Sequence, residues 1–321
     1  MRRAKRTVGI IGTGWVGTSI AISTLHSGAA DELLLYDLRT DVAEGEAMDL
    51  AQGATFYPAA AVRAAALDEI AAADAIVVTA GRGGKPNETR LDLLRDNARI
   101  IRDLGRELAP HLARSHGAVI MVTNPVDVLT RVMAEVTGLP AARVIGTGTM
   151  LDTARLREAI SQAIDIDPRS VHAHVVGEHG DSEVFLWSAA RAGGTPLRAW
   201  PGWTAESEAR IATQVRTAAY EIIRRKGATN HAIGLVTANL LRSMLRGERR
   251  VLTVSRVQDG TSSLSGVALS LPAVVTGDGA TLVIEPEMSA DERLALAHSA
   301  DILQTAYDSL DAAPAGDGTR Q

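Results

Sequence analysis

Short apolar runs alternate with longer amphipathic runs through the first half of the chain. The apolar runs are rich in β-branched residues and cover 7–11, 33–36, 75–79, 118–123 and 144–148. The runs between them have helical spacing and cover 15–27, 41–52, 90–112 and 125–137. Strands that are apolar on both faces, each followed by a helix, predict a parallel sheet covered on both sides. Residues 1–148 are therefore expected to form an α/β domain with a doubly wound (Rossmann) sheet.

The second half of the chain has a different pattern, in which helices and strands no longer alternate. Helical spacing covers 151–162, 206–225, 230–246 and 291–310, and strand patterns cover 171–176, 251–255, 267–272 and 281–284. This order predicts an α+β substrate domain over residues 149–321. Because no internal repeat or low-complexity linker separates the halves, we expect them to share an interface.

Composition narrows the class of protein. The chain has 321 residues, is 46% hydrophobic and carries a net charge of −5, so a general affinity for nucleic acid or anionic membrane has no electrostatic basis. It contains no cysteine, which excludes thiol catalysis and agrees with a reducing compartment. The basic start MRRAKR runs directly into TVGIIGTG rather than into the apolar stretch of a signal peptide. We expect a cytoplasmic protein with neither nucleic-acid nor membrane partners.

A glycine-rich turn directly follows the first apolar run. GTGWVG places Gly12, Gly14 and Gly17 between a predicted strand and a predicted helix. One glycine allows the tight turn, the next lets the backbone approach a pyrophosphate, and the third lets helix pack on strand. Asp37 lies about 20 residues further on, at the end of the second apolar run, where its carboxylate would accept hydrogen bonds from a ribose diol. The same charge would repel the 2′-phosphate of NADP, so we expect NAD.

Residues suited to proton transfer and to carboxylate binding gather in later motifs. Asp152 and Arg155 are three apart on a predicted helix and so share a face. Arg155 offers a planar fork for a substrate carboxylate. His179, between glycines in GEHGDS, would exchange a proton with a substrate oxygen while Asp152 orients its ring. Asn124, in TNPVD, follows a predicted strand at the carboxyl edge of the sheet, where ligands bind.

The motifs GTGWVG, KPNETR, TNPVD, GTGTMLDTARLR and GEHGDSE, in this order, resemble the L-lactate/malate dehydrogenase family. The resemblance covers nearly the whole chain and is closest to the bacterial L-lactate dehydrogenases. It implies an NAD-dependent oxidoreductase of 2-hydroxy acids, most simply one that interconverts pyruvate and L-lactate in glycolysis. It also gives His179, Asp152, Arg155 and Asn124 the roles just described. Further cofactor contacts that it implies are Val16, Thr79, Gly81, Asn97 and Asn124.

The loop GRGGKPNETR resembles the mobile lid of this family, and the resemblance makes Arg90 the arginine that polarises the substrate carbonyl on closure. Gly84 occupies the position where similar lactate dehydrogenases carry glutamine and malate dehydrogenases carry arginine. Without a cation there, a second substrate carboxylate lacks its partner unless Arg82 or Lys85 replaces it. Malate is therefore disfavoured, and the missing side chain leaves room for bulkier 2-keto acids. Thr229 conflicts with this, because it matches a threonine that limits the substrate pocket.

Two cations suggest regulation. Arg157 lies two residues beyond Arg155, about 200° around the helix, so it should point away from the substrate. Arg157 and His172 match the pair with which allosteric bacterial relatives bind fructose 1,6-bisphosphate between subunits, which implies a homo-oligomer, a tetramer or else a dimer. A surface arginine beside a hydrogen-bonded histidine is the simpler alternative. His172 and His174 lack a convincing third ligand, so no metal site is expected.

Two other functions remain open. NAD-dependent glycosidases have a similar nucleotide domain, but resemblance to them implies a metal site that uses cysteine, which this chain lacks. A non-catalytic NAD-binding protein would keep the fold and lose the chemistry, yet Arg90, Asn124, Asp152, Arg155 and His179 are all present.

Overall fold

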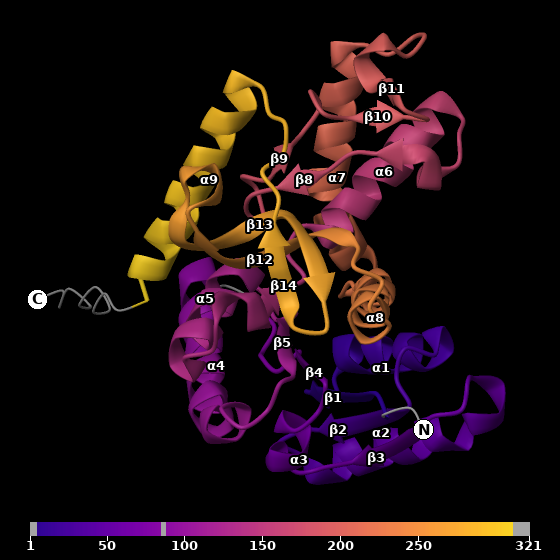
Figure 1. Ribbon diagram of the computed structural model, residues 1–321, viewed down its shortest axis with the longest axis vertical. Helices are drawn as coiled ribbons and strands as arrows, with labels where there is room; N and C mark the ends of the chain where they lie inside the picture. Colours follow the sequence, from indigo (N-terminus) through magenta and orange to yellow (C-terminus); the bar gives the residue numbers. More distant parts are fainter. Residues whose placement is uncertain (1–4, 85–87, 311–321) are drawn as a thin grey trace, which may run out of the picture.

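A nine-stranded mixed sheet runs through the molecule (Figure 1). The computed structural model describes residues 5–84 and 88–310. Six parallel strands have the order β3-β2-β1-β4-β5-β6, which is the doubly wound order. Their bounds are β1 Thr7–Ile11, β2 Glu32–Tyr36, β3 Ala61–Ala64, β4 Ala75–Val78, β5 Ala118–Met121 and β6 Val144–Gly146. The predicted α/β fold with a parallel core is confirmed.

Three antiparallel strands extend this sheet beyond β6. They are β12 Val251–Asp259, β13 Ser265–Thr276 and β14 Gly279–Val283. Ser255 of β12 pairs with Gly146 of β6, so strands from the second half of the chain continue the sheet of the first half. The two predicted domains, 1–148 and 149–321, therefore contribute strands to one sheet.

Helices cover both faces of the sheet, as the apolar strands require. Along β4, Ile76 and Val78 pack on one face, whereas Ala75 and Val77 pack on the other. The first face is covered by α3 Leu67–Ala71, α4 Arg90–Leu112, α5 Val126–Thr137 and α9 Ala290–Asp308. The second face is covered by α1 Trp15–Ser27, α2 Thr40–Gln52 and α8 His231–Leu245. This alternation buries every side chain of β4 and β5.

The remaining elements form a third apolar cluster at the end of the molecule opposite β3 (Figure 1). Long helices α6 Met150–Ile164 and α7 Ala205–Lys226 pack there against short strands. These strands are β7 Val171–His172, β8 Val175–Val176, β9 Val184–Phe185, β10 Arg191–Ala192 and β11 Thr195–Pro196. Short 3-10 turns are η1 Ala54–Phe56, η2 Ala141–Arg143, η3 Pro168–Ser170, η4 Leu197–Ala199 and η5 Thr261–Ser263.

The strand pattern is wrong in several places, and it gives no strand at β9, β10 or β11. The predicted strand 171–176 is two strands, because β7 pairs with β10 whereas β8 pairs with β9. His172 and His174 therefore do not share the face of one strand. The pattern also gives no strand at β3, an edge strand whose residues are exposed or half-buried and include Arg63. Among the described residues, no helix combines the length and hydropathy needed to span a bilayer.

Candidate active site

The turn between β1 and α1 is built to leave its backbone uncovered. Gly12 adopts a φ of 95°, in the region that favours glycine. A Cβ on Gly17 would lie 1.9 Å from the Gly12 carbonyl oxygen, so helix and turn approach too closely for any side chain. A Cβ on Gly14 would meet nothing within 4 Å. Gly14 caps the helix without a side chain, so the N–H groups of the first turn face open space that fits a pyrophosphate.

A cavity of about 480 Å³ extends from this turn along the carboxyl edge of the sheet. Its lining includes the predicted cofactor residues Gly12, Gly14, Asp37, Thr79 and Gly81. The Thr79 hydroxyl donates to the Gly12 carbonyl (2.7 Å) and so fixes the glycine turn. The cavity and its residues fit a dinucleotide, with the glycine turn placed for the phosphates.

Asp37 lines this cavity and is ionised. Its Oδ2 accepts from the Thr13 backbone N–H (2.9 Å) and its Oδ1 from the Arg39 backbone N–H (3.0 Å). Burial opposes ionisation, but these hydrogen bonds outweigh it and the pKa of Asp37 falls below its ordinary value. A carboxylate at this point can accept from a ribose diol and repels a 2′-phosphate.

His179, Asp152 and Arg155 form one hydrogen-bonded unit. Nδ1 of His179 lies 2.5 Å from Oδ2 of Asp152, and Nη1 of Arg155 donates to Oδ1 of the same carboxylate (3.0 Å). Asp152 is 3% exposed, so its charge is shielded from water and directed at these two partners. Since Nδ1 is engaged, Nε2 of His179 is the nitrogen left for a substrate.

The charges of this unit favour an imidazolium. Burial alone would lower the pKa of His179, but the charge and hydrogen bond of Asp152 raise it to about 9. Burial likewise opposes ionisation of Asp152, yet His179 and Arg155 hold its pKa below its ordinary value. At neutral pH the unit is an imidazolium and a guanidinium that share one carboxylate, so it carries one net positive charge for an anionic substrate.

A small cavity of about 130 Å³ lies directly against this unit. Of the predicted residues, His179, Arg155, Asn124, Thr229 and Val16 line it. Sequence reasoning did not find the remaining lining residues, which come from five separate segments: Val122, Thr147, Gly148, Leu151, Ala219, Ile223 and Ile233. Thr147, Gly148 and Leu151 lie in the motif GTGTMLDTARLR but received no role, whereas the other four show only the apolar character that every core residue shares. The cavity thus combines a cationic end with apolar walls, as a small organic anion requires.

Seven predicted residues line neither cavity: Gly17, Asp152, Arg157, His172, Arg90, Gly84 and Asn97. Arg90 has an 81% exposed side chain that donates to Asp181 (3.0 Å) and to the Tyr220 hydroxyl (3.0 Å). Gly84 is exposed beside Leu93. Asn97 is 1% exposed: its Oδ1 accepts from the Arg82 backbone N–H, and its Nδ2 donates to the Arg82 and Asn124 carbonyls. Asn97 therefore ties the base of the loop to the strand end that carries Asn124.

Two buried acids beside His179 carry no role in the sequence prediction, although both belong to its motifs. Asp127 of TNPVD accepts from the His179 backbone N–H (2.7 Å). Glu183 of GEHGDSE is 4% exposed, and burial together with the charge of Asp152 raises its pKa to about 8. Burial and the charge of Asp152 therefore disfavour the ionised form of Glu183. Proximity to His179 is a tertiary property that no local spacing reveals.

A dinucleotide turn followed by an acid, opening onto an imidazolium–carboxylate–guanidinium unit, defines a nicotinamide-dependent dehydrogenase of small acids. Comparisons with known proteins agree. Residues 6–146 match the model of the lactate/malate dehydrogenase NAD binding domain, and residues 149–312 match the alpha/beta C-terminal domain of the same family. The chain belongs to the lactate/malate dehydrogenase family.

Individual relatives match over nearly their full length. The chain is 44% identical to an L-lactate dehydrogenase of Synechococcus sp. (strain JA-3-3Ab), covering 94% of this chain and 98% of the relative. It is also 44% identical to one of Salinibacter ruber, covering 94% and 96%. The crystal structure of the minor L-lactate dehydrogenase from Enterococcus mundtii in the ligands-bound form has a TM-score of 0.92 at 37% identity, covering 96% of this chain and 99% of that one.

The geometry of Asp37 predicts which coenzyme binds. Asp37→Asn keeps an acceptor for the Thr13 N–H but removes the charge that attracts the ribose diol and repels a 2′-phosphate. Because a hydrogen bond to a charged group contributes about 1.5–3 kcal/mol, the preference for NADH over NADPH should fall by about tenfold or more. Fluorescence titration with both coenzymes measures this. Asp41→Asn, at an exposed acid outside the cavity, is the control, and an unchanged preference in Asp37→Asn would contradict the assignment.

Proposed function

We propose that this protein is an NAD-dependent L-lactate dehydrogenase that interconverts pyruvate and L-lactate. The observation that carries the proposal is the unit of His179, Asp152 and Arg155 at the wall of a small cavity beside the dinucleotide turn. Its charge and size suit a small 2-keto acid, and the relatives above bear the name L-lactate dehydrogenase. Residues 1–148 would bind NAD and residues 149–321 would supply most of the substrate contacts. By resemblance to this family, we also propose that the reaction takes place in the cytoplasm, at the pyruvate step of glycolysis.

The residues divide the chemistry among them. Arg155 binds the substrate carboxylate through its fork, while Asn124, which lines the same cavity, donates to the keto oxygen. Nε2 of His179 donates its proton to that oxygen during reduction and takes it back during oxidation. Asp152 holds the imidazole in orientation and balances its charge. The bound nicotinamide would supply or accept the hydride.

Arg90 would join this set when the loop closes over the substrate. In the structure its partners are Asp181 and Tyr220, which lie at the surface. Exchange of these exposed contacts for the keto oxygen costs little, because surface ion pairs contribute about 0–1 kcal/mol. A guanidinium in a drier, closed site stabilises the developing oxyanion more strongly.

The loop favours a monocarboxylate over a dicarboxylate. Arg82, one candidate partner for a second carboxylate, already donates to Glu88 (2.8 Å) and to Asp96 (2.9 Å). Lys85, the other candidate, lies outside the described residues. Among the described residues, a Cβ at Gly84 would approach Leu93 alone, at 3.5 Å, which is an ordinary van der Waals contact.

The first prediction on activity concerns His179. His179→Asn should lower kcat/KM for pyruvate by about 100- to 10,000-fold, because the proton donor is lost. NADH oxidation at neutral pH measures it, with thermal unfolding to confirm that the variant is folded. His111→Asn, in the last turn of α4 and outside the small cavity, should retain wild-type activity. If the wild type oxidises NADH with none of the 2-keto acids, only a binding function remains.

The second prediction on activity concerns Gly84. In the wild type kcat/KM should be highest for pyruvate, and a panel with oxaloacetate, 2-ketoisocaproate and phenylpyruvate measures it. Gly84→Gln should reduce the two bulky acids most, because it fills the free space. Gly84→Arg should raise the ratio of oxaloacetate to pyruvate at least about tenfold, because it supplies the missing cation. Wild-type preference for oxaloacetate by more than tenfold would refute the substrate assignment.

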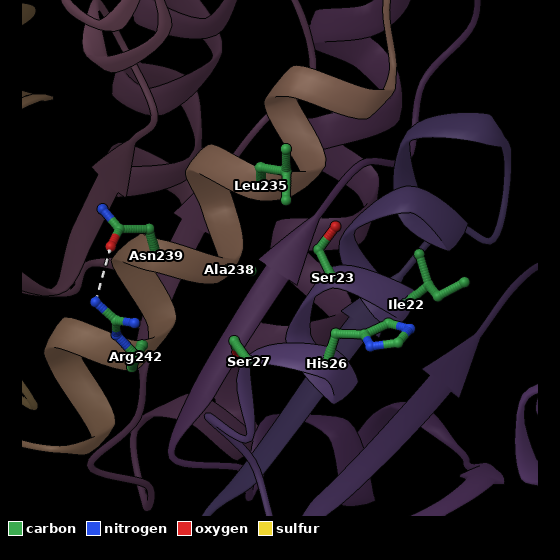
Figure 2. A pocket seen from close by; sticks show the side chains of 8 residues that line it. All are labelled: Ile22, Ser23, His26, Ser27, Leu235, Ala238, Asn239 and Arg242. Carbon is green, nitrogen blue, oxygen red and sulfur yellow. Dashed lines mark hydrogen bonds between the residues drawn. The ribbon is translucent and has the colours of Figure 1, made fainter. Parts of the chain in front are cut away.

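We also propose a homo-oligomer, a tetramer or else a dimer. Exposed apolar side chains support a contact between copies: Ile22 of α1 is 49% exposed and Leu235 of α8 is 65% exposed. Figure 2 shows both projecting at a surface hollow of about 470 Å³ between the two helices. Burial of such a patch against a second copy would remove it from water.

A cluster of cations supports the proposed effector site. Arg157 faces away from the substrate cavity and donates to the Ala173 carbonyl (3.0 Å). Burial and the nearby Arg250 guanidinium lower the pKa of Arg157. Burial and the charges of Arg157 and His172 lower the pKa of His174 to about 4. Positive groups held this close together repel one another, so a polyanion such as fructose 1,6-bisphosphate would relieve the repulsion.

The effector proposal predicts activation. Fructose 1,6-bisphosphate should lower KM for pyruvate at subsaturating pyruvate, and Arg157→Gln should abolish the effect without changing basal kcat. Arg169→Gln, a fully exposed arginine paired with Asp167, is the matched control. Sedimentation in the same buffers reports the oligomeric state. If KM is unchanged by millimolar effector, Arg157 serves only its hydrogen bond to Ala173.

A further inference from the structure

Asp127 joins the two segments that carry Asn124 and His179. It lies in the first turn of α5, directly after the strand end that bears Asn124. Its side chain is 2% exposed, and Oδ2 accepts from the His179 backbone N–H at 2.7 Å. Its second oxygen, Oδ1, is buried and has no hydrogen-bond partner among the residues that the structure describes. Asp127 lines neither cavity, so it does not touch the substrate.

One short hydrogen bond does not account for an acid at this position. A buried carboxylate with one backbone donor and the Ser255 hydroxyl beside it is costly, and a neutral side chain would accept from the same N–H. Burial raises the pKa of Asp127 to about 6, against the opposing effects of the Ser255 hydroxyl, the His179 amide and the imidazolium charge. At neutral pH the group is therefore mostly ionised. The partial positive charge at the start of α5 favours the same form.

The imidazolium of His179 is the charge that Asp127 faces. Asp127 favours the protonated form of His179, as does Asp152, whose carboxylate contacts the ring nitrogen Nδ1. Three further titratable or charged groups act on this pair. Glu183 at the start of β9 and Glu178 beside His179 are acids, and Arg155 of α6 is a cation. Arg216 of α7 lies against Glu183, to whose backbone carbonyl it donates at 3.1 Å.

We propose that Asp127 is a positioning residue for the proton donor: its carboxylate fixes the backbone at His179 and supplies the second negative charge that keeps the imidazole protonated for reduction of the keto group. The inference rests on the proposed function, because it assigns a role in that reaction. The Asp127 side chain then has two separate roles. The hydrogen bond sets geometry, and the charge sets the pH range of each direction of the reaction.

Asp127→Asn separates these roles, since asparagine has the same shape and an acceptor oxygen but no charge. Pyruvate reduction needs protonated His179, so its kcat/KM falls as pH rises through the pKa of His179. Lactate oxidation needs neutral His179, so its kcat/KM rises through the same pKa. Loss of a neighbouring negative charge lowers that pKa by roughly one unit. Both pH-dependent limbs, the fall in kcat/KM for pyruvate reduction and the rise in kcat/KM for lactate oxidation, should therefore move to lower pH. Above its limb, kcat/KM for pyruvate reduction should be about tenfold lower than in the wild type, and at pH 6.5 it should be little changed.

Two variants serve as controls. Asp74→Asn makes the same change at a carboxylate that accepts from the Thr7 backbone N–H (2.8 Å) at the amino edge of the sheet, and it should leave both limbs in place. Asp127→Glu keeps the charge, so its limbs should coincide with those of the wild type even where kcat falls. If Asp127→Asn does not fold, Asp127→Glu decides, and a downward shift of its limbs overturns the proposal.

Direct titration of His179 by ¹⁵N NMR, with the coenzyme-free protein, gives a readout that needs no turnover. Its pKa should be lower in Asp127→Asn than in the wild type. Superimposable limbs in both directions, or an equal loss at every pH, would show that the carboxylate is only a structural anchor. Failure of the wild type to interconvert pyruvate and lactate would refute the proposed function, and the NMR titration would still test the charge.

Discussion

One buried carboxylate organises the chemistry of this protein. Asp152 gives one oxygen to the ring of His179 and the other to the guanidinium of Arg155. Because water is excluded from it, the two hydrogen bonds are strong and directional. A single side chain thereby sets the relative positions of the proposed proton donor and the proposed carboxylate anchor. Distance between those two groups matters more than the strength of either one, since a keto acid must contact both at once.

The cofactor side of the site is organised by the opposite means, the removal of side chains. At Gly17 any Cβ would collide with the Gly12 carbonyl, and at Gly14 the space in front of the backbone stays open. Two side chains hold the turn in place: the Thr79 hydroxyl donates to the Gly12 carbonyl, and Asp37 accepts from the Thr13 backbone N–H. One half of the site therefore depends on a dense cluster of charges, and the other on an uncovered backbone.

Local chemistry explains what the sequence predicts well. The parallel core and most helices follow from apolar periodicity, and the triad of His179, Asp152 and Arg155 follows from helical spacing and motif order. The misses have a tertiary origin. Strand β3 is short and at an edge, so no apolar run marks it. The chain between His172 and Val175 changes partner sheets, which periodicity does not register.

The position of Arg90 and the neighbours of His179 are harder to predict from the sequence. Arg90 is recognisable from its motif, yet its contacts with Asp181 and Tyr220 depend on a loop and two distant elements. Asp127 lies three residues after Asn124 in the same motif, but only the folded chain brings it to the His179 amide, 52 residues away. Residues that contact one another through the backbone leave no signature in spacing.

The pairing of Ser255 with Gly146 has a mechanical consequence. The coenzyme cavity and the keto-acid cavity are both built on one hydrogen-bonded sheet. The two halves of the chain therefore cannot rotate apart without breaking strand pairs. Gly146 allows the two strands to approach closely, because a Cβ there would lie 3.1 Å from Cβ of Ser255. Opening and closing must then be left to small surface segments moving against a stiff frame, so turnover would be paced by loop motion rather than by rotation of one lobe about another.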